Sequence, residues 1–186
     1  MPCHGYSTTA YACRRGSLLR NVKNSVCQDC YALKNRYVFP NVQAALNKRL
    51  YAVLNDPDWT ELITELISRK EKSGYFRWHD SGDIQSLEHL QNIFRICRKT
   101  PDTKHWLPTR EAQILKRVKV NEVPRNLVIR FSSHMIDQAP VNFWPWTSTV
   151  TTDGNHSCPA ATQNNECKDC RQCWSRDVKN VSYGKH

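Results

Sequence analysis

The sequence predicts an α/β fold in which a partial (βα) barrel-like parallel sheet carries a cysteine-rich segment at each end of the chain. Short apolar runs alternate with helical periodicities in the middle of the chain, polar clusters follow these runs, and most of the nine cysteines lie outside this region. We expect a single domain of 186 residues. It would comprise an N-terminal cysteine-rich segment (1–37), an α/β core (38–150) and a cysteine-rich tail (151–186).

Helices are predicted where apolar residues recur at helical spacing. One helix begins at Pro40, which suits a first turn, and a second begins near Asp56. Ser86 is a candidate N-cap for a third helix, which ends before Pro101. A fourth includes Ile114, Leu115 and Val118, whereas residues 1–37 lack a sustained period and are predicted to be a loop.

Three strands are predicted between these helices, at residues 75–79, 104–107 and 126–131. In parallel sheets, ligands bind at the carboxyl ends of the strands, where loops gather polar groups. Each predicted strand is followed by such a cluster, and any one cluster alone could be an ordinary turn. Together they predict a site formed by strand-end residues on one rim of the sheet: His79, Ser81, Gly82, Asp83, Thr109, Arg110 and His134.

Composition restricts the protein class. The sequence has no apolar run long enough for a membrane span or a signal peptide, so we expect the protein in the cytoplasm. Thiols stay reduced in that compartment, and clustered cysteines there usually bind metal. The formal charge of +10 could attract nucleic acid, but metal-bound thiolates would offset much of it.

The C-terminal cysteines carry the strongest signal. Cys167, Cys170 and Cys173 form a Cys-x-x-Cys-x-x-Cys run, and Cys158 precedes it by eight intervening residues. Such a run suits one face of a four-iron, four-sulfur (4Fe-4S) cluster, with the remote thiolate as fourth ligand. Zinc remains an alternative, although its structural sites usually consist of two separated Cys-x-x-Cys pairs.

A second group consists of Cys13, Cys27 and Cys30, followed directly by Tyr31. Three thiolates leave one iron of a cluster open to a substrate or cofactor, unless Cys3 or His4 closes the site. The sequence leaves open whether the two groups hold two clusters or share one. Cys97 lies on the apolar face of a predicted helix and is interpreted as a buried hydrophobic residue.

The motifs ACRRGSLLRNVKNSVCQDCYALKNRY, FRWHDSGDIQSLEHLQNIF and CPAATQNNECKDCRQCW resemble the phage family called gene product 88. That family is itself similar to radical S-adenosylmethionine enzymes, in which three cysteines hold a four-iron cluster whose open iron binds the cofactor. The resemblance implies that Cys13, Cys27 and Cys30 hold the open cluster beside Tyr31. It also implies that Ser81, Gly82 and Asp83 receive the cofactor's amino group, and that the C-terminal cysteines hold an auxiliary cluster.

Two functions follow from these observations. The first is a cluster-dependent redox or radical enzyme with S-adenosylmethionine as a candidate cofactor. The second is a non-catalytic iron-sulfur or zinc accessory protein that binds nucleic acid or a host protein through a basic, aromatic surface. Residues 143–146 (Phe-Trp-Pro-Trp) could stack on bases, although they are better interpreted as a buried cover over the sheet.

Overall fold

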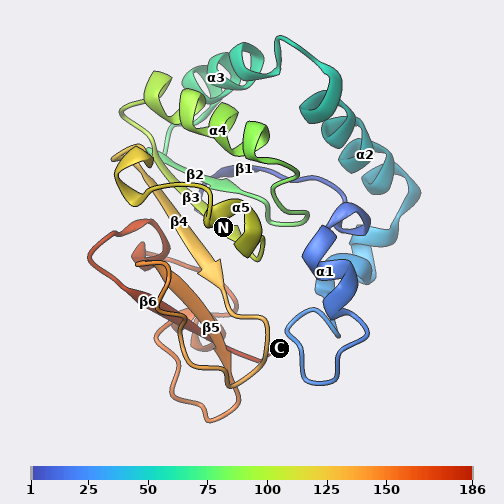
Figure 1. The fold of residues 1–186 in the computed structure, drawn as a ribbon, viewed down its shortest axis with the longest axis vertical. Helices are drawn as coiled ribbons and strands as arrows, with labels where there is room; N and C mark the ends of the chain where they lie inside the picture. The colour runs from blue at the N-terminus through green and yellow to red at the C-terminus, as the bar shows by residue number, and fades with distance from the viewer. Residues whose placement is uncertain (1, 186) are drawn as a thin grey trace.

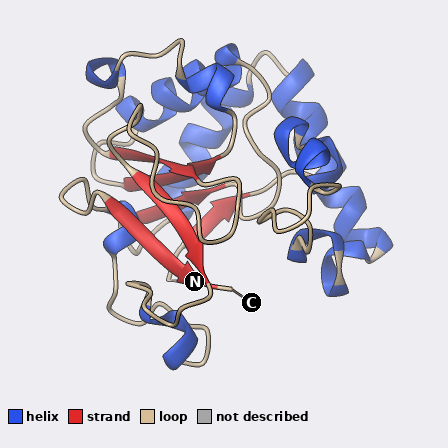
Figure 2. Ribbon diagram, turned by 60° about the horizontal axis from the view of Figure 1, so that its bottom comes forward, coloured by secondary structure: helices blue, strands red, loops and turns tan. Residues whose placement is uncertain are grey.

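The protein, described over residues 2–185 by a computed structural model, is built on one open, six-stranded sheet. All five neighbouring pairs are parallel and follow chain order: β1 (His4–Tyr6), β2 (Tyr75–Trp78), β3 (Lys104–Thr109), β4 (Leu127–Ser132), β5 (Thr147–Thr151) and β6 (Asn180–Gly184). Figure 1 shows helices α3 and α4 on one side of the sheet, and Figure 2 shows the open sheet from another direction. The α/β class and the parallel sheet are therefore confirmed, and the sheet does not close.

The three strands in the middle of the chain match the sequence prediction, whereas β1, β5 and β6 were not predicted. β1 has only three residues, and β5 and β6 read TSTVT and NVSYG, with few large apolar side chains. Sequence alone gives such short polar strands a weak signal. β1 pairs with β2, β5 with β4, and β6 with β5, so these strands depend on pairing with segments that are distant in sequence.

The helices are α1 (Arg14–Leu19), α2 (Pro40–Asn55), α3 (Trp59–Lys70), α4 (Leu87–Lys99) and α5 (Ala112–Leu115). Pro40 stands in the first turn of α2, and the Ser86 hydroxyl accepts a hydrogen bond from His89 N, which confirms both predicted starts. Helix α1 and several 3₁₀ turns occupy the segment predicted to be a loop. Among the described residues, no helix has the length and apolar character needed to span a bilayer.

The main core lies between the sheet and helices α3 and α4. From the sheet, Phe76, Trp78, Leu107 and Ile129 are buried in it. The helices contribute a larger set of buried side chains: Ile63, Ile67, Leu90, Ile93, Phe94, Ile96 and Cys97. Cys97 is therefore a buried residue of the core, as its place on the apolar face of the helix predicts.

The opposite face of the sheet is covered by the C-terminal segment, including the 3₁₀ helix Gln172–Trp174, instead of α-helices. Here Trp106, Cys173, Trp174 and Val181 form a second buried cluster. Trp174 packs edge-on against Trp106, with ring centroids 5.1 Å apart, and its Nε1 donates a hydrogen bond of 2.9 Å to Phe76 O. The residue after the last cysteine thus fixes the tail to the centre of the sheet.

The aromatic segment before β5 covers the core. Trp144 and Trp146 are buried, and their Nε1 atoms donate to the carbonyls of Ile129 and Arg176. The interpretation of this segment as a buried cover is confirmed for the two tryptophans, whereas Phe143 is exposed. The two tryptophans are not available to stack on bases.

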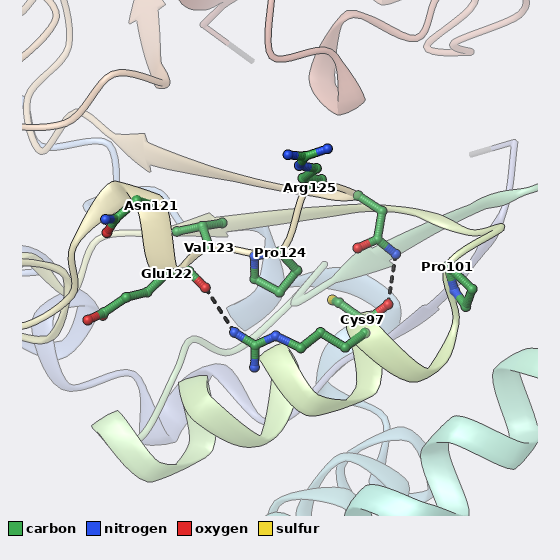
Figure 3. Close-up of a pocket in the computed structure, with 9 residues that line it drawn as sticks. Cys97, Pro101, Asn121, Glu122, Val123, Pro124 and Arg125 are labelled. Atoms are coloured by element: carbon green, nitrogen blue, oxygen red, sulfur yellow. Dashed lines mark hydrogen bonds between the residues drawn. The ribbon is translucent and has the colours of Figure 1, made fainter.

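An open pocket of about 380 Å³ lies at the amino edge of the sheet, between the end of α4 and the segment before β4. Cys97, Glu122, Val123 and Pro124 are among its lining residues in Figure 3. The Asn126 side chain donates to three carbonyls beside it, including that of Cys97, and thereby caps the end of α4. The pocket is therefore a feature of the capped end of α4.

Buried histidines make folding sensitive to acid. Burial lowers the pKa of His89 in α4 to about 4. As the pH falls below 6.5, the His89 ring therefore takes up a proton in the unfolded chain before it does so in the folded protein. The stabilisation conferred by the neutral ring is present above pH 6.5 and is lost as the pH falls. Between pH 7 and pH 5, we expect the unfolding free energy to fall by about 2 kcal/mol less in His89→Asn than in the parent protein.

Urea denaturation at both pH values measures this difference. His4→Asn is the matched control, because it makes the same substitution at a ring that is largely exposed. An equal pH dependence in His89→Asn and the parent protein would contradict the prediction.

Candidate functional site

The N-terminal cysteines meet beside the first turn of α1. Cys13 is the N-cap residue of this helix, and Cys27 and Cys30 lie in the turns that follow it. A β-carbon at Gly16 would lie 3.8 Å from the Sγ atoms of both Cys13 and Cys27. Burial raises the pKa of the Cys13 thiol, and Asp83, Cys30 and Cys27 raise it further, so the three thiols share one electrostatic environment.

This cysteine segment is joined to the loops at the carboxyl edge of the sheet. Thr8 N donates to Ser81 O at 3.1 Å, and Ser81 Oγ donates to Thr8 O at 2.7 Å. Gly82 has a φ of +83°, and a β-carbon there would lie 2.0 Å from Thr8 Oγ1. Ser81 and Gly82 therefore hold the loop that leads from β1 to Cys13.

Two further anchors come from the ends of β3 and β4. The buried Glu111 carboxylate accepts a 2.8 Å hydrogen bond from Arg15 N in the first turn of α1. Val26 N, next to Cys27, donates to His134 O at 2.9 Å, and Ser25 forms an antiparallel bridge with Met135. Both cysteine turns are thus attached to strand ends that are distant in sequence.

Tyr31 lies beside the same edge. Its hydroxyl donates to Asp80 O, and the Tyr37 hydroxyl donates to the Asp80 carboxylate, which also pairs with Arg77 at 2.6 Å. The Tyr31 and Tyr37 rings contact each other edge-on, with centroids 5.7 Å apart. The aromatic residue after Cys30 therefore connects the cysteine segment to the loop after β2.

Asp83 joins the loop after β2 to the end of β3. Its carboxylate accepts hydrogen bonds from Thr109 Oγ1 at 2.6 Å, from Arg110 N at 2.9 Å and from Ile84 N at 2.8 Å. Burial nevertheless raises the pKa of Asp83 to about 6. Burial raises the pKa of Cys27, and the nearby Arg110 guanidinium partly offsets this by lowering it. Arg110 Nε has no hydrogen-bond partner among the described residues.

The strand-end residues thus differ in what they can contact. Asp83, Arg110 and His134 gather at the carboxyl edge, where His134 Nε2 lies 3.1 Å from Arg110 O. The His79 ring is instead buried against Trp78 and His89 under helix α4. Ser81, Asp83 and Thr109 already use their polar side-chain atoms to join neighbouring loops.

The C-terminal cysteines form a separate group against β6 and the second buried cluster. Cys158 N donates to Ser182 O at 2.9 Å, and Cys173 Sγ lies 3.2 Å from Tyr183 Oη. Burial raises the pKa of Cys158, and the nearby Cys167 and Cys170 raise it further. The four cysteines are therefore neighbours in space, as their spacing predicts.

Cys3 belongs with this second group. It packs against the cluster of Trp106, Cys173, Trp174 and Val181, and its thiol interacts electrostatically with that of Cys167. The exposed His4 is hydrogen-bonded to Glu71. The sequence left open whether Cys3 completes the N-terminal group, and the structure places it elsewhere.

No three His, Cys, Asp or Glu side chains among residues 2–185 are placed to hold one metal ion. Thiolates around a single zinc ion lie only roughly 3.8 Å apart, as a 2.3 Å bond and a tetrahedral angle require. Neither cysteine group among residues 2–185 shows that arrangement.

A family model described as Gene product 88 matches residues 1–151. The chain belongs to the Gene product 88 family. This is a family of bacteriophage proteins, and the match confirms the family that the sequence motifs resemble. No curated protein and no solved structure matches the chain.

The family match covers the N-terminal cysteine group and the strand ends around it. It stops at the end of β5, before Cys158, so the C-terminal group lies outside the matched region. Several residues that support these sites were not predicted from the sequence: Thr8, Gly16, Glu111, Arg130 and Tyr183. Only Glu111 had a local signal, because it follows Thr109 and Arg110 at a strand end.

Proposed function

We propose that this Gene product 88 protein is an iron-sulfur protein with two 4Fe-4S clusters and an open iron in the first. Cys13, Cys27 and Cys30 would hold the first cluster, and Cys158, Cys167, Cys170 and Cys173 the second. The observation that supports it best is the convergence of three thiols, from separate turns, at the carboxyl edge of a parallel sheet. Polar loop residues meet at the same edge.

The donor set suits such a cluster. Each group contains thiols without histidine or carboxylate ligands, and thiolates are the usual ligands of iron-sulfur clusters. A cubane is larger than a single ion, so its ligands stand farther apart than those of zinc. Gly16 leaves space beside Cys13 and Cys27 that any larger residue would fill.

Buried positive charge supports the same assignment. The Arg130 guanidinium is fully buried, and within residues 2–185 it hydrogen-bonds only to carbonyl oxygens. Burial lowers the pKa of Arg130, whereas Tyr183 and Cys173 favour its charge. Arg110 likewise lies near Cys27. A buried cation is costly unless an anion compensates it, and a thiolate-bound cluster is an anion.

The open iron would serve redox or radical chemistry, and S-adenosylmethionine is the candidate cofactor. The similarity to radical S-adenosylmethionine enzymes is what the resemblance to the family implies. In this proposal Asp83, Thr109 and the Arg110 backbone position the loops around the cluster, and the Arg110 side chain offers a positive charge to a carboxylate. Tyr31 lines the same edge from the cysteine side.

Anaerobic purification followed by iron, sulfide and Mössbauer analysis tests the proposal. We expect about eight iron atoms per chain, and a loss of about four in either Cys27→Ala or Cys170→Ser. Cys97→Ala is the matched control, because this buried cysteine lies in the main core. Full iron content in Cys27→Ala would exclude the first cluster, and zinc in place of iron would favour the accessory-protein alternative.

The open iron is tested separately. Adding S-adenosylmethionine to the reduced Cys170→Ser protein, which retains only the first cluster, should change its electron paramagnetic resonance spectrum. Ligation of iron by amino and carboxylate groups alters the electronic environment of the cluster. An unchanged spectrum would exclude this cofactor while leaving the cluster assignment intact.

A further inference from the structure

The positive charge of the protein is concentrated in one part of the fold. The N-terminal lobe (residues 10–55) comprises α1, α2 and the turns between them, and it lies along the right side of the molecule in Figure 1. It contains eight lysine and arginine side chains but a single acidic one, Asp29, so its formal charge is +7. The rest of the chain has nineteen basic and sixteen acidic side chains, a charge of only +3. A quarter of the residues therefore carries most of the net charge.

This charge faces solvent and is mostly unpaired. Six of the eight basic residues of the lobe are exposed: Arg14, Lys23, Lys34, Arg36, Lys48 and Arg49. Asp29 pairs with Lys34 at 3.0 Å, and within residues 2–185 the other seven basic side chains of the lobe make no ion pair. A positive surface without neighbouring carboxylates attracts a polyanion.

The same lobe also presents aromatic rings to solvent. Four of the five exposed aromatic side chains of residues 2–185 belong to it, each at least 50% exposed: Tyr11, Tyr31, Phe39 and Tyr51. Lys48 and Tyr51 are three residues apart on the outer face of α2 and are therefore neighbours on its surface. The Arg20 guanidinium lies 5.8 Å from the centroid of the Tyr11 ring. Aromatic rings interspersed with cations are typical of surfaces that bind single-stranded nucleic acid, because bases stack on the rings.

Hydrogen bonds hold the parts of the lobe in place. Gln43 of α2 accepts a 3.0 Å hydrogen bond from Thr9 Oγ1, just before Tyr11, and donates a 2.6 Å bond to Tyr37 O. Tyr37 in turn packs edge-on against Tyr31. Helix α2 is thus joined to the turns on both sides of the first cysteine group, and the charges and rings are positioned before any partner binds.

We propose that the N-terminal lobe binds single-stranded nucleic acid, with phosphates on its lysines and arginines and bases stacked on its exposed rings. A duplex would satisfy the charges but would leave the rings without partners, because its bases are already stacked on one another. The inference goes beyond the proposed cluster function and does not depend on a metal in either cysteine group.

Fluorescence anisotropy with a labelled oligothymidine of about 20 nucleotides, long enough for the usual site sizes, tests this inference. We expect the parent protein to bind and its affinity to fall as salt is added. The double variant Arg36→Ala, Lys48→Ala should reduce the slope of log K against log salt by about 1.4, because each lost phosphate contact removes about 0.7. The matched control is Lys70→Ala, Lys72→Ala, which removes two exposed lysines outside the lobe and should leave the slope unchanged. Equal losses in the two double variants would overturn the inference.

Stacking is tested at Tyr51, which is 68% exposed, so its replacement should not disturb the fold. Tyr51→Ala should weaken binding about fivefold or more, whereas Tyr51→Phe keeps the ring and should bind like the parent protein. Unchanged binding by Tyr51→Ala, or tighter binding of a duplex of the same length, would show that the single-strand assignment is wrong. No binding of the oligonucleotide at low salt would also overturn it, and binding to phosphatidylserine vesicles would then assign the surface to an anionic membrane. Iron content plays no part in these outcomes, so they are independent of the cluster proposal.

Discussion

Replacement of Arg130 by methionine is expected to release the C-terminal cysteine segment from the sheet. The guanidinium of this β4 residue donates to five carbonyl oxygens: those of Thr147, Gln172, Cys173, Ser175 and Val178. Four of these carbonyls lie in the turn around Cys173. Methionine fills a similar volume but donates nothing, so several buried carbonyls would lose their partner.

Each buried group left without a partner costs about 1–3 kcal/mol. We therefore expect the Arg130→Met protein to lose more than about 3 kcal/mol of unfolding free energy and the four iron atoms of the C-terminal site. Hydrogen exchange should show early opening of residues 158–178 while β2–β4 stay protected. Arg125→Met is the control, because Arg125 is exposed. Normal iron content in Arg130→Met would show that the turn around Cys173 holds its shape without this residue.

Replacement of Gly82 by alanine should displace the loop that carries the N-terminal cysteines. The new β-carbon would lie 2.0 Å from Thr8 Oγ1 and 3.0 Å from Thr8 O, and the φ of +83° disfavours any L side chain. Backbone strain of about 1–2 kcal/mol adds to an overpacking cost of about 1–3 kcal/mol. Because Thr8 leads directly into the cysteine segment, we expect loss of the first cluster as well.

Gly154→Ala provides a matched comparison for this prediction. Gly154 has a similar φ of +78°, but a β-carbon there would have no atom within 4 Å. It should therefore cost only the backbone strain and leave the iron content unchanged. If urea denaturation shows the two variants to be equally destabilised, the contact between Thr8 and Gly82 has no energetic role.

The strands and helices that the sequence predicted share one property: each buries a regular row of large apolar side chains. In α4 the row includes Leu90, Ile93 and Phe94, and in β2 it is Phe76 and Trp78. Periodicity reports such burial directly. β1, β5 and β6 have no such row, and their hydrogen-bond partners come from strands elsewhere in the chain.

The residues of the two sites also differ in whether the sequence could predict their roles. The spacing of Cys167, Cys170 and Cys173 is local, so their grouping was visible in the sequence. The roles of Ser81 and Gly82 were not, because their contacts with Thr8 depend on β1 and β2 pairing side by side. The resemblance assigns both residues to a cofactor, whereas their observed contacts hold the cysteine loop.

The sequence by itself thus determined the α/β class, the four-cysteine C-terminal group and the polar strand ends, because each shows in the periodicity or spacing of residues that are close together in the chain. Only the tertiary structure decided that Cys3 joins the C-terminal group, that the His79 ring turns into the core, and that Arg130 fixes the turn around Cys173. These outcomes depend on which face of a strand each side chain occupies and on which distant segment packs there. Pairing between segments far apart in the chain sets both, and no single segment of the sequence carries that information.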